Sequence, residues 1–151
     1  MTYDSKMDTL NHIERVRELL YEACSNFERR AYVHDDSKLV EPEKSAFDIA
    51  TPKLKELEYG SDEYKASLAE LGSALHHHYQ ENSHHPEHYP DGIRGMSLFD
   101  VIEMLLDWKA ATERHTTGDI LKSIEQNQQR FGYSDDIKAI FLNTANEMGW
   151  K

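Results

Sequence analysis

Apolar residues recur at helical spacing along most of the chain, whereas the apolar and polar alternation of strands is nearly absent. The first stretch illustrates the pattern, with apolar side chains every three or four residues at Leu10, Ile13, Val16, Leu20, Ala23 and Phe27. This spacing predicts a helix from about residue 8 to 30 with one buried stripe, which His12 borders. We therefore expect an all-α bundle of about six to seven helices, forming a single domain over residues 1–151.

Proline, glycine and serine predict where the next helices begin. A short helix is expected from His34 to Leu39, and Pro42 allows another to begin because proline is tolerated in a first turn. Pro52 is expected to begin a further turn. Ser61 follows a glycine and caps a helix predicted to continue to about Asn82.

The second half of the chain predicts three more helices after a proline-rich loop over residues 86–92. Ser97 and Asp100 have the spacing of a capping box. The helix that they start is apolar on most of its faces and is therefore expected to be central. Gly118 precedes a helix through residues 120–131, and a last amphipathic helix is expected to end near Met148.

Composition narrows the classes of partner. The chain of 151 residues has 28 acidic and 17 basic side chains and a formal charge of −11, so polymeric nucleic acid is disfavoured, although a small nucleotide is not. No apolar run is long enough for a membrane span, and the first residues do not resemble a secretory signal. The single cysteine, Cys24, fits a reducing cytoplasm.

Three acidic side chains lie on the central helix, although this helix is expected to be mostly buried. Asp100, Glu103 and Asp107 lie on one narrow stripe of this helix, which would be a solvated edge if it faced water. Asp107 is flanked by apolar residues, where an ionised carboxylate must be paired or bound to a cation. The doublet His34-Asp35 and the inward-facing His12 could meet it in a bundle, although a single inward histidine is more commonly a hydrogen-bonded core residue.

The pattern of His12, His34-Asp35 and Asp107 resembles the metal-binding motif of the HD-domain phosphohydrolases. The resemblance implies an all-α bundle in which these residues hold a divalent cation between helices. Imidazole nitrogen and carboxylate oxygen together suit Mn, Fe, Co or Zn. Lys38 follows the doublet as in a branch of that family whose lysine assists at the phosphate. The whole chain is also similar to a small uncharacterised group of HD-like proteins of bacteria and their phages.

Six of the nine histidines lie between His76 and His88. The pair His84-His85 is similar to the segment that supplies a second metal in two-metal HD proteins, and His78 could reach nearly the same side. The resemblance thus implies one or two ions, with His78, His84 and His85 as further ligands. The alternative is a polar helix end without ligands.

The sequence therefore favours a metal-dependent phosphohydrolase acting on a small phosphate ester, with a nucleotide as the expected substrate. Asp35, Lys38 and Glu103 are the predicted catalytic residues, and Lys38, Asn127 and Arg130 are predicted to bind substrate. Two alternatives stay open: an HD-fold di-iron oxygenase and a non-catalytic metal-binding helical module. We expect neither a nucleic-acid polymer nor a membrane as partner, and the sequence leaves the oligomeric state undetermined.

Overall fold

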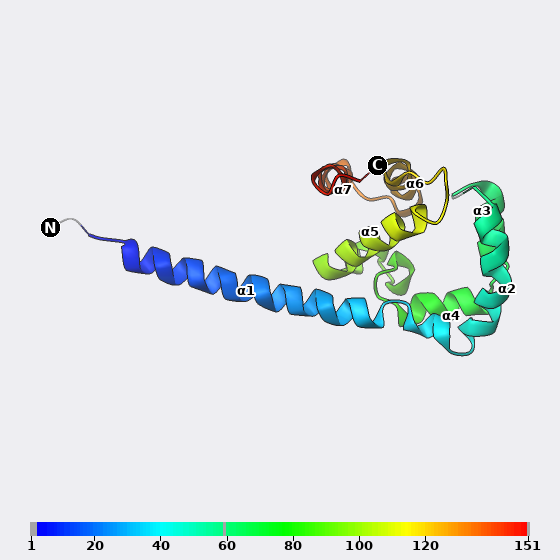
Figure 1. Cartoon of the computed structure of the whole chain (residues 1–151), viewed down its shortest axis with the longest axis horizontal. Helices are drawn as coiled ribbons and strands as arrows, with labels where there is room; N and C mark the ends of the chain where they lie inside the picture. The colour runs from blue at the N-terminus through cyan, green and yellow to red at the C-terminus, as the bar shows by residue number, and fades with distance from the viewer. Residues whose placement is uncertain (1–2, 59, 151) are drawn as a thin grey trace. The chain divides into compact units, whose positions relative to one another are not determined.

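The computed structural model describes residues 3–58 and 60–150, and these form helices and turns without a strand (Figure 1). The predicted all-α fold is confirmed. The α-helices are α1 (Lys6–Val33), α2 (Glu43–Glu56), α3 (Asp62–Ala69), α4 (Ser73–Glu81), α5 (Leu98–Thr112), α6 (Ile120–Phe131) and α7 (Asp135–Glu147). Short 3₁₀ turns are η1 (Asp36–Leu39), η2 (Pro86–His88) and η3 (Gly92–Gly95).

The chain divides into two compact units, residues 1–34 and 35–151. In its described part, the first unit consists of α1 and its flanking residues, and no residue of this helix is buried. Leu10, Ile13, Val16 and Leu20 are exposed, and so is His12. Within the first unit no second element covers the apolar face of α1, so the predicted burial of this stripe stays a prediction. The prediction of one domain over the whole chain stays a prediction.

Helix α5 provides the centre of the second unit, as its composition predicted. Met104, Leu105 and Trp108 are buried together with residues of the two following helices. The Trp108 ring stacks on Phe131 of α6 and meets Phe141 of α7 edge-on, with ring centroids 6.1 and 5.9 Å away. Helix α5 packs on α6 and α6 packs on α7, so the core lies among these three helices.

Two predicted helix starts, at Ser97 and Ser61, are confirmed by their capping bonds. The Ser97 hydroxyl accepts from the backbone N–H of Asp100, whose carboxylate accepts from the backbone N–H of Ser97, which is a full capping box. The Ser61 hydroxyl caps α3 with a single bond. The Ser134 hydroxyl does the same at α7, a helix start for which the sequence predicted no cap. These bonds satisfy helix N–H groups that would otherwise lack partners.

Three predicted boundaries are wrong. The expected helix from residue 62 to about 82 is interrupted at Gly72, where a φ of 51° starts a new helix in a new direction. Pro52 lies inside α2 rather than beginning a turn. The short helix expected from His34 is a single 3₁₀ turn that begins after Asp35.

Gly118 lies in the link between α5 and α6 at a point of close backbone approach. A Cβ at this position would lie 1.9 Å from the carbonyl oxygen of Thr112. Gly118→Ala is therefore expected to destabilise the fold by about 1–3 kcal/mol, because backbone atoms must shift to admit the methyl group. Urea denaturation will measure this, with Thr116→Ala in the same exposed segment as the control. Equal stability of the two variants would contradict the close approach.

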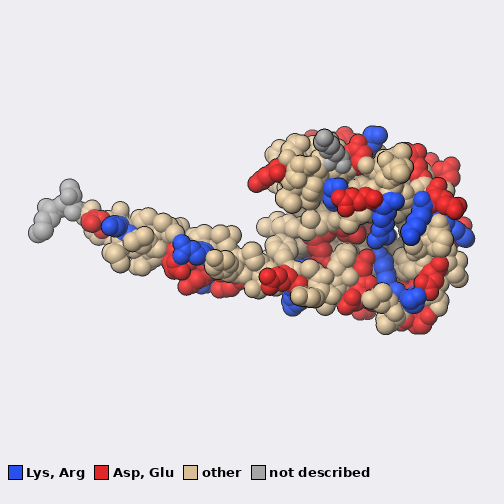
Figure 2. All heavy atoms as spheres, viewed as in Figure 1, with Lys and Arg blue, Asp and Glu red and all other residues tan. Residues whose placement is uncertain are grey.

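No helix in residues 3–58 and 60–150 combines the length and apolar character that a bilayer span requires. Figure 2 shows that basic side chains lie among acidic ones on the visible face of the second unit. The net negative charge of −11 is thus not gathered into one acidic surface on that face.

Candidate metal centre

Three imidazole nitrogens and one carboxylate oxygen converge inside the second unit. His78 lies on α4, His84 and His85 follow in the next loop, and Asp35 precedes η1. His78 Nε2 lies 2.9 Å from His85 Nε2 and 3.4 Å from Asp35 Oδ1, and His84 Nε2 lies 3.6 Å from the same oxygen. One ligand atom from each residue lies within 4.8 Å of the other three. This set is hereafter called the Asp35–His cluster.

The spacing of these atoms fits a divalent transition metal. Four ligands at about 2.0–2.1 Å from a tetrahedral ion are about 3.3–3.4 Å apart, and neighbouring ligands of an octahedral ion are about 2.9 Å apart. The separations of 2.9, 3.4 and 3.6 Å cover this range. Three neutral nitrogens and one anionic oxygen are also the donors that Mn, Fe, Co and Zn accept. The residues present therefore fit such an ion.

Carboxylates lie behind two of the three imidazoles. His78 Nδ1 is 2.9 Å from Glu43 Oε2, and His84 Nδ1 is 3.3 Å from Glu103 Oε1. His78 and His84 are buried, with 1 % and 2 % of their surfaces exposed. A carboxylate on the remote nitrogen of a histidine orients the ring and directs the other nitrogen to the metal in many metalloproteins. Glu43 and Glu103 thus lie where they could orient the two rings toward an ion.

The environment keeps two of the imidazoles neutral. Burial and the nearby Lys38 ammonium lower the pKa of His78, against the opposing charges of Asp35 and Glu43. Burial, the neighbouring histidines and the charges of Lys38 and Arg130 hold the pKa of His85 well below its usual range. Only a neutral imidazole can ligate a metal, so His78 and His85 are ready to do so at neutral pH.

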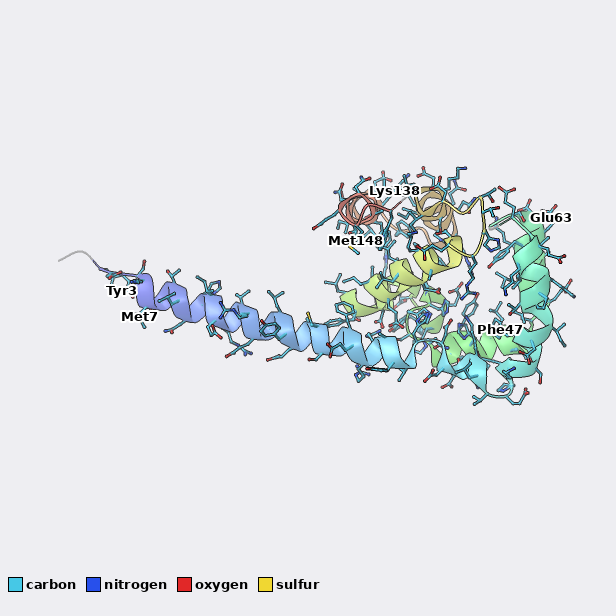
Figure 3. All side chains as sticks on the ribbon, viewed as in Figure 1. Tyr3, Met7, Phe47, Glu63, Lys138 and Met148 are labelled. Carbon is cyan, nitrogen blue, oxygen red and sulfur yellow. The ribbon has the colours of Figure 1, made fainter. Side chains whose placement is uncertain are left out.

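Asp35 joins the cluster to a basic side chain. Its Oδ1 faces the histidines, while its Oδ2 accepts a 2.6 Å ion pair from Lys38 Nζ. The same ammonium lies 5.0 Å from the ring centroid of Phe47, and that ring meets His78 edge-on. Phe47 lies on α2 and is labelled in Figure 3. Asp35 has a left-handed backbone with φ 60°, which aspartate tolerates better than most residues. The carboxylate of Asp35 therefore lies between the Lys38 ammonium and the candidate metal position.

Asp100 anchors the loop that carries His84 to the start of α5. Its carboxylate accepts hydrogen bonds from Ser83 Oγ (2.7 Å), Tyr89 Oη (2.9 Å) and the Ser97 hydroxyl (2.6 Å), besides the capping bond. Only 3 % of the residue is exposed. Burial by itself raises the pKa of Asp100, but hydrogen bonds from Ser97, Ser83 and Tyr89 outweigh it and hold the pKa far below the usual range. The carboxylate is therefore a charged structural group.

Asp100→Asn is expected to destabilise the fold by about 2–3 kcal/mol, because an amide cannot accept all these bonds. Because its pKa is depressed in the folded state, the carboxylate contributes its full stabilisation at pH values above its unfolded-state pKa of about 3.9. That contribution is lost as the pH falls through the folded-state pKa. Urea denaturation from pH 7 to 3 should show a constant difference in the free energy of unfolding between wild type and variant above about pH 5. This difference should narrow in acid. A gap that widens in acid would contradict this assignment.

Asp107, the predicted ligand on α5, lies close to Asp35. One of its ligand oxygens lies within 4.8 Å of one from Asp35. His12 and His34 belong to the first unit, so their metal-binding roles stay predictions. Glu103, a predicted catalytic residue, lies 3.3 Å from Nδ1 of His84, the ring nitrogen that faces away from Asp35.

Of the two predicted substrate-binding residues on α6, one is linked by contacts to the Asp35–His cluster and the other is not. Arg130 forms a 2.6 Å ion pair with Glu87 and lies 3.3 Å from the hydroxyl of Tyr79, whose ring is 5.0 Å from that of His85. Arg130 is therefore linked to the edge of the cluster. Asn127 donates to Ser123 Oγ of its own helix at 3.3 Å. No described contact joins Asn127 to the cluster.

Glu43 is the important residue that sequence reasoning missed. It gives no signal in the sequence, because an acidic residue in a first helical turn needs no other explanation. Its side chain is fully buried, with 0 % exposed, and contacts two histidines. No pattern in the sequence reveals a pairing between residues so far apart.

In a comparison with models of protein families, one model matches residues 1–147, which is nearly the whole chain. The chain belongs to DUF5662, a family of unknown function. No curated protein and no solved structure matches it. For this member of DUF5662, the argument for function therefore depends on the Asp35–His cluster itself.

Proposed function

We propose that the chain is a metal-dependent phosphohydrolase of the HD-domain type that acts on a small phosphate ester, with a nucleotide as the expected substrate. The observation that carries the proposal is the convergence of Asp35 Oδ1 with the Nε2 atoms of His78 and His84, together with the close approach of His85 Nε2 to His78. Asp107, within 4.8 Å of Asp35, adds a second carboxylate at this place.

The cofactor of the proposal is one or two ions of Mn, Fe, Co or Zn. When bound, such an ion acts as a Lewis acid, lowers the pKa of coordinated water and screens phosphate charge. His78, His84, His85 and Asp35 would hold it. The resemblance to HD proteins adds His12, His34 and Asp107 as candidate ligands.

Lys38 gives the site the positive charge that a phosphate ester needs in a protein of net charge −11. Its ammonium pairs with Asp35 Oδ2, so it flanks the group that would bind the metal. A lysine in this position can interact with a phosphoryl oxygen as negative charge develops there. Arg130 could add a second cationic contact from the side of Tyr79 and His85.

The proposal is tested on the full-length chain by two measurements. Metal content is determined after purification with and without air, and phosphate release is then screened over nucleoside mono-, di- and triphosphates with Mn, Fe, Co and Zn added singly. We expect near-stoichiometric metal and metal-dependent release from at least one nucleotide. Metal-dependent oxygen consumption without phosphate release would instead favour the di-iron oxygenase. Bound metal with neither activity would favour a non-catalytic metal-binding module.

A further inference from the structure

Glu43 is a fully buried carboxylate whose two oxygens face different histidines of α4. Oε1 lies 2.8 Å from His77 Nδ1 and Oε2 lies 2.9 Å from His78 Nδ1. Ser37 Oγ donates to the same Oε2 at 3.0 Å. Because a buried charge is costly unless it is paired and hydrogen-bonded, Glu43 depends on these three partners.

The hydrogens around His78 can be assigned one by one. The Asn82 amide has two hydrogens, and it donates to the His78 carbonyl oxygen and to Ser37 Oγ, both at 2.8 Å. The Ser37 hydroxyl has one hydrogen and donates it to Glu43. Asn82 Nδ2 and Ser37 Oγ also lie 3.0 and 3.3 Å from His78 Nδ1, but neither has a hydrogen left for it. The hydrogen between Nδ1 and Glu43 therefore comes from the imidazole.

This assignment fixes which nitrogen of His78 is available to a metal. A neutral imidazole with its proton on Nδ1 has its lone pair on Nε2. Nε2 is the atom that faces Asp35 Oδ1 at 3.4 Å and His85 Nε2 at 2.9 Å. The carboxylate thus selects the tautomer and aims the lone pair of His78 into the Asp35–His cluster.

We propose that Glu43 is a positioning residue of the metal centre, which holds His78 in the metal-binding tautomer and orientation. The inference rests on the metal centre of the proposed function, but not on the reaction that this centre catalyses. Glu43 does not touch the metal position itself, since both of its oxygens contact the remote Nδ1 atoms. Its effect is therefore on the affinity and the geometry of metal binding.

The first experiment measures Zn²⁺ affinity of the full-length Glu43→Gln variant by competition with a chromophoric chelator. A glutamine keeps the shape but cannot accept at both positions, so the affinity should fall by about 10–100-fold. The Co²⁺ absorption spectrum should also change, because it reports the ligand geometry. Glu81→Gln on α4, where Glu81 is exposed, is the matched control and should keep wild-type affinity. Wild-type affinity of Glu43→Gln would overturn the proposal.

A double-mutant comparison tests whether Glu43 affects metal binding through His78 or by another route. If Glu43 acts through His78, then Glu43→Gln combined with His78→Ala should bind Zn²⁺ as His78→Ala does, since the effects of coupled residues do not add. A further 10-fold loss in the double variant would show that Glu43 acts elsewhere and would overturn the proposal.

A measurement on the wild-type protein keeps the proposal testable if Glu43→Gln does not fold. Imidazole ¹⁵N chemical shifts of the metal-free chain distinguish the two tautomers of each histidine. We expect His78 to carry its proton on Nδ1, and a proton on Nε2 would overturn the proposal. These three readouts need no substrate, so their failure is distinct from a failure to find phosphohydrolase activity.

Discussion

The full-length chain in which His84 and His85 are both replaced by alanine is expected to lose its bound metal. The change removes two of the three imidazoles of the Asp35–His cluster, whose Nε2 atoms lie beside Asp35 Oδ1 and His78 Nε2. Wild type should also gain thermal stability when metal is added, by about 2.7 kcal/mol at a free concentration 100 times the Kd. The double variant should show no such gain. Metal analysis after gel filtration and thermal melts with and without Zn²⁺ measure both effects.

His76→Ala is the control for this experiment, because His76 is an exposed histidine of α4. It should keep wild-type metal content and the wild-type gain in melting temperature. Full occupancy in the double variant would show that the cluster is not the metal site. The remaining candidates would then be Asp107 and the two histidines of the first unit.

Lys38→Ala is expected to lower kcat on the best phosphate ester by roughly 10²–10³ while metal is retained. The ammonium is not among the candidate ligands, so its removal should spare binding of the ion. It pairs with Asp35 Oδ2 at 2.6 Å, which places its charge beside the proposed phosphate position. Steady-state kinetics with metal content measured on the same samples will test this.

The matched control is Lys44→Ala, which removes an exposed lysine of α2 paired with Asp48. Its kcat and KM should equal those of wild type. A Lys38→Ala enzyme with wild-type kcat would contradict the catalytic role of this lysine. A selective rise in KM would instead assign Lys38 to substrate binding in the ground state.

The helices and their starts could largely be predicted from the sequence because their determinants are local. Serine hydroxyls bond to N–H groups a few residues away at Ser61 and Ser97, and the apolar composition of α5 reflects its central place. The break at Gly72 was missed because the leucine spacing continues across it. Helix periodicity does not record a change in helix direction.

In the candidate site too, features that depend on local sequence could be predicted, whereas those that depend on tertiary packing could not. His78, His84 and His85 could be selected as candidate ligands because their clustering is visible in the sequence and resembles a segment of two-metal HD proteins. Their meeting with Asp35 could not be foreseen, because it depends on how α4 packs on η1. Glu43 could not be found at all, since its role arises only from tertiary contact.

Asp100 shows how a helix cap can restrict sequence variation. Serine, threonine, aspartate and glutamate often replace one another around helix starts at small cost. Here the carboxylate at the third position of α5 also holds Ser83, the residue before His84, and Tyr89. A glutamate, longer by one methylene, would keep the capping bond only by displacing the loop that carries the histidines. Members of DUF5662 that share this centre should therefore keep aspartate here, and cap-optimising design at this helix should leave it unchanged.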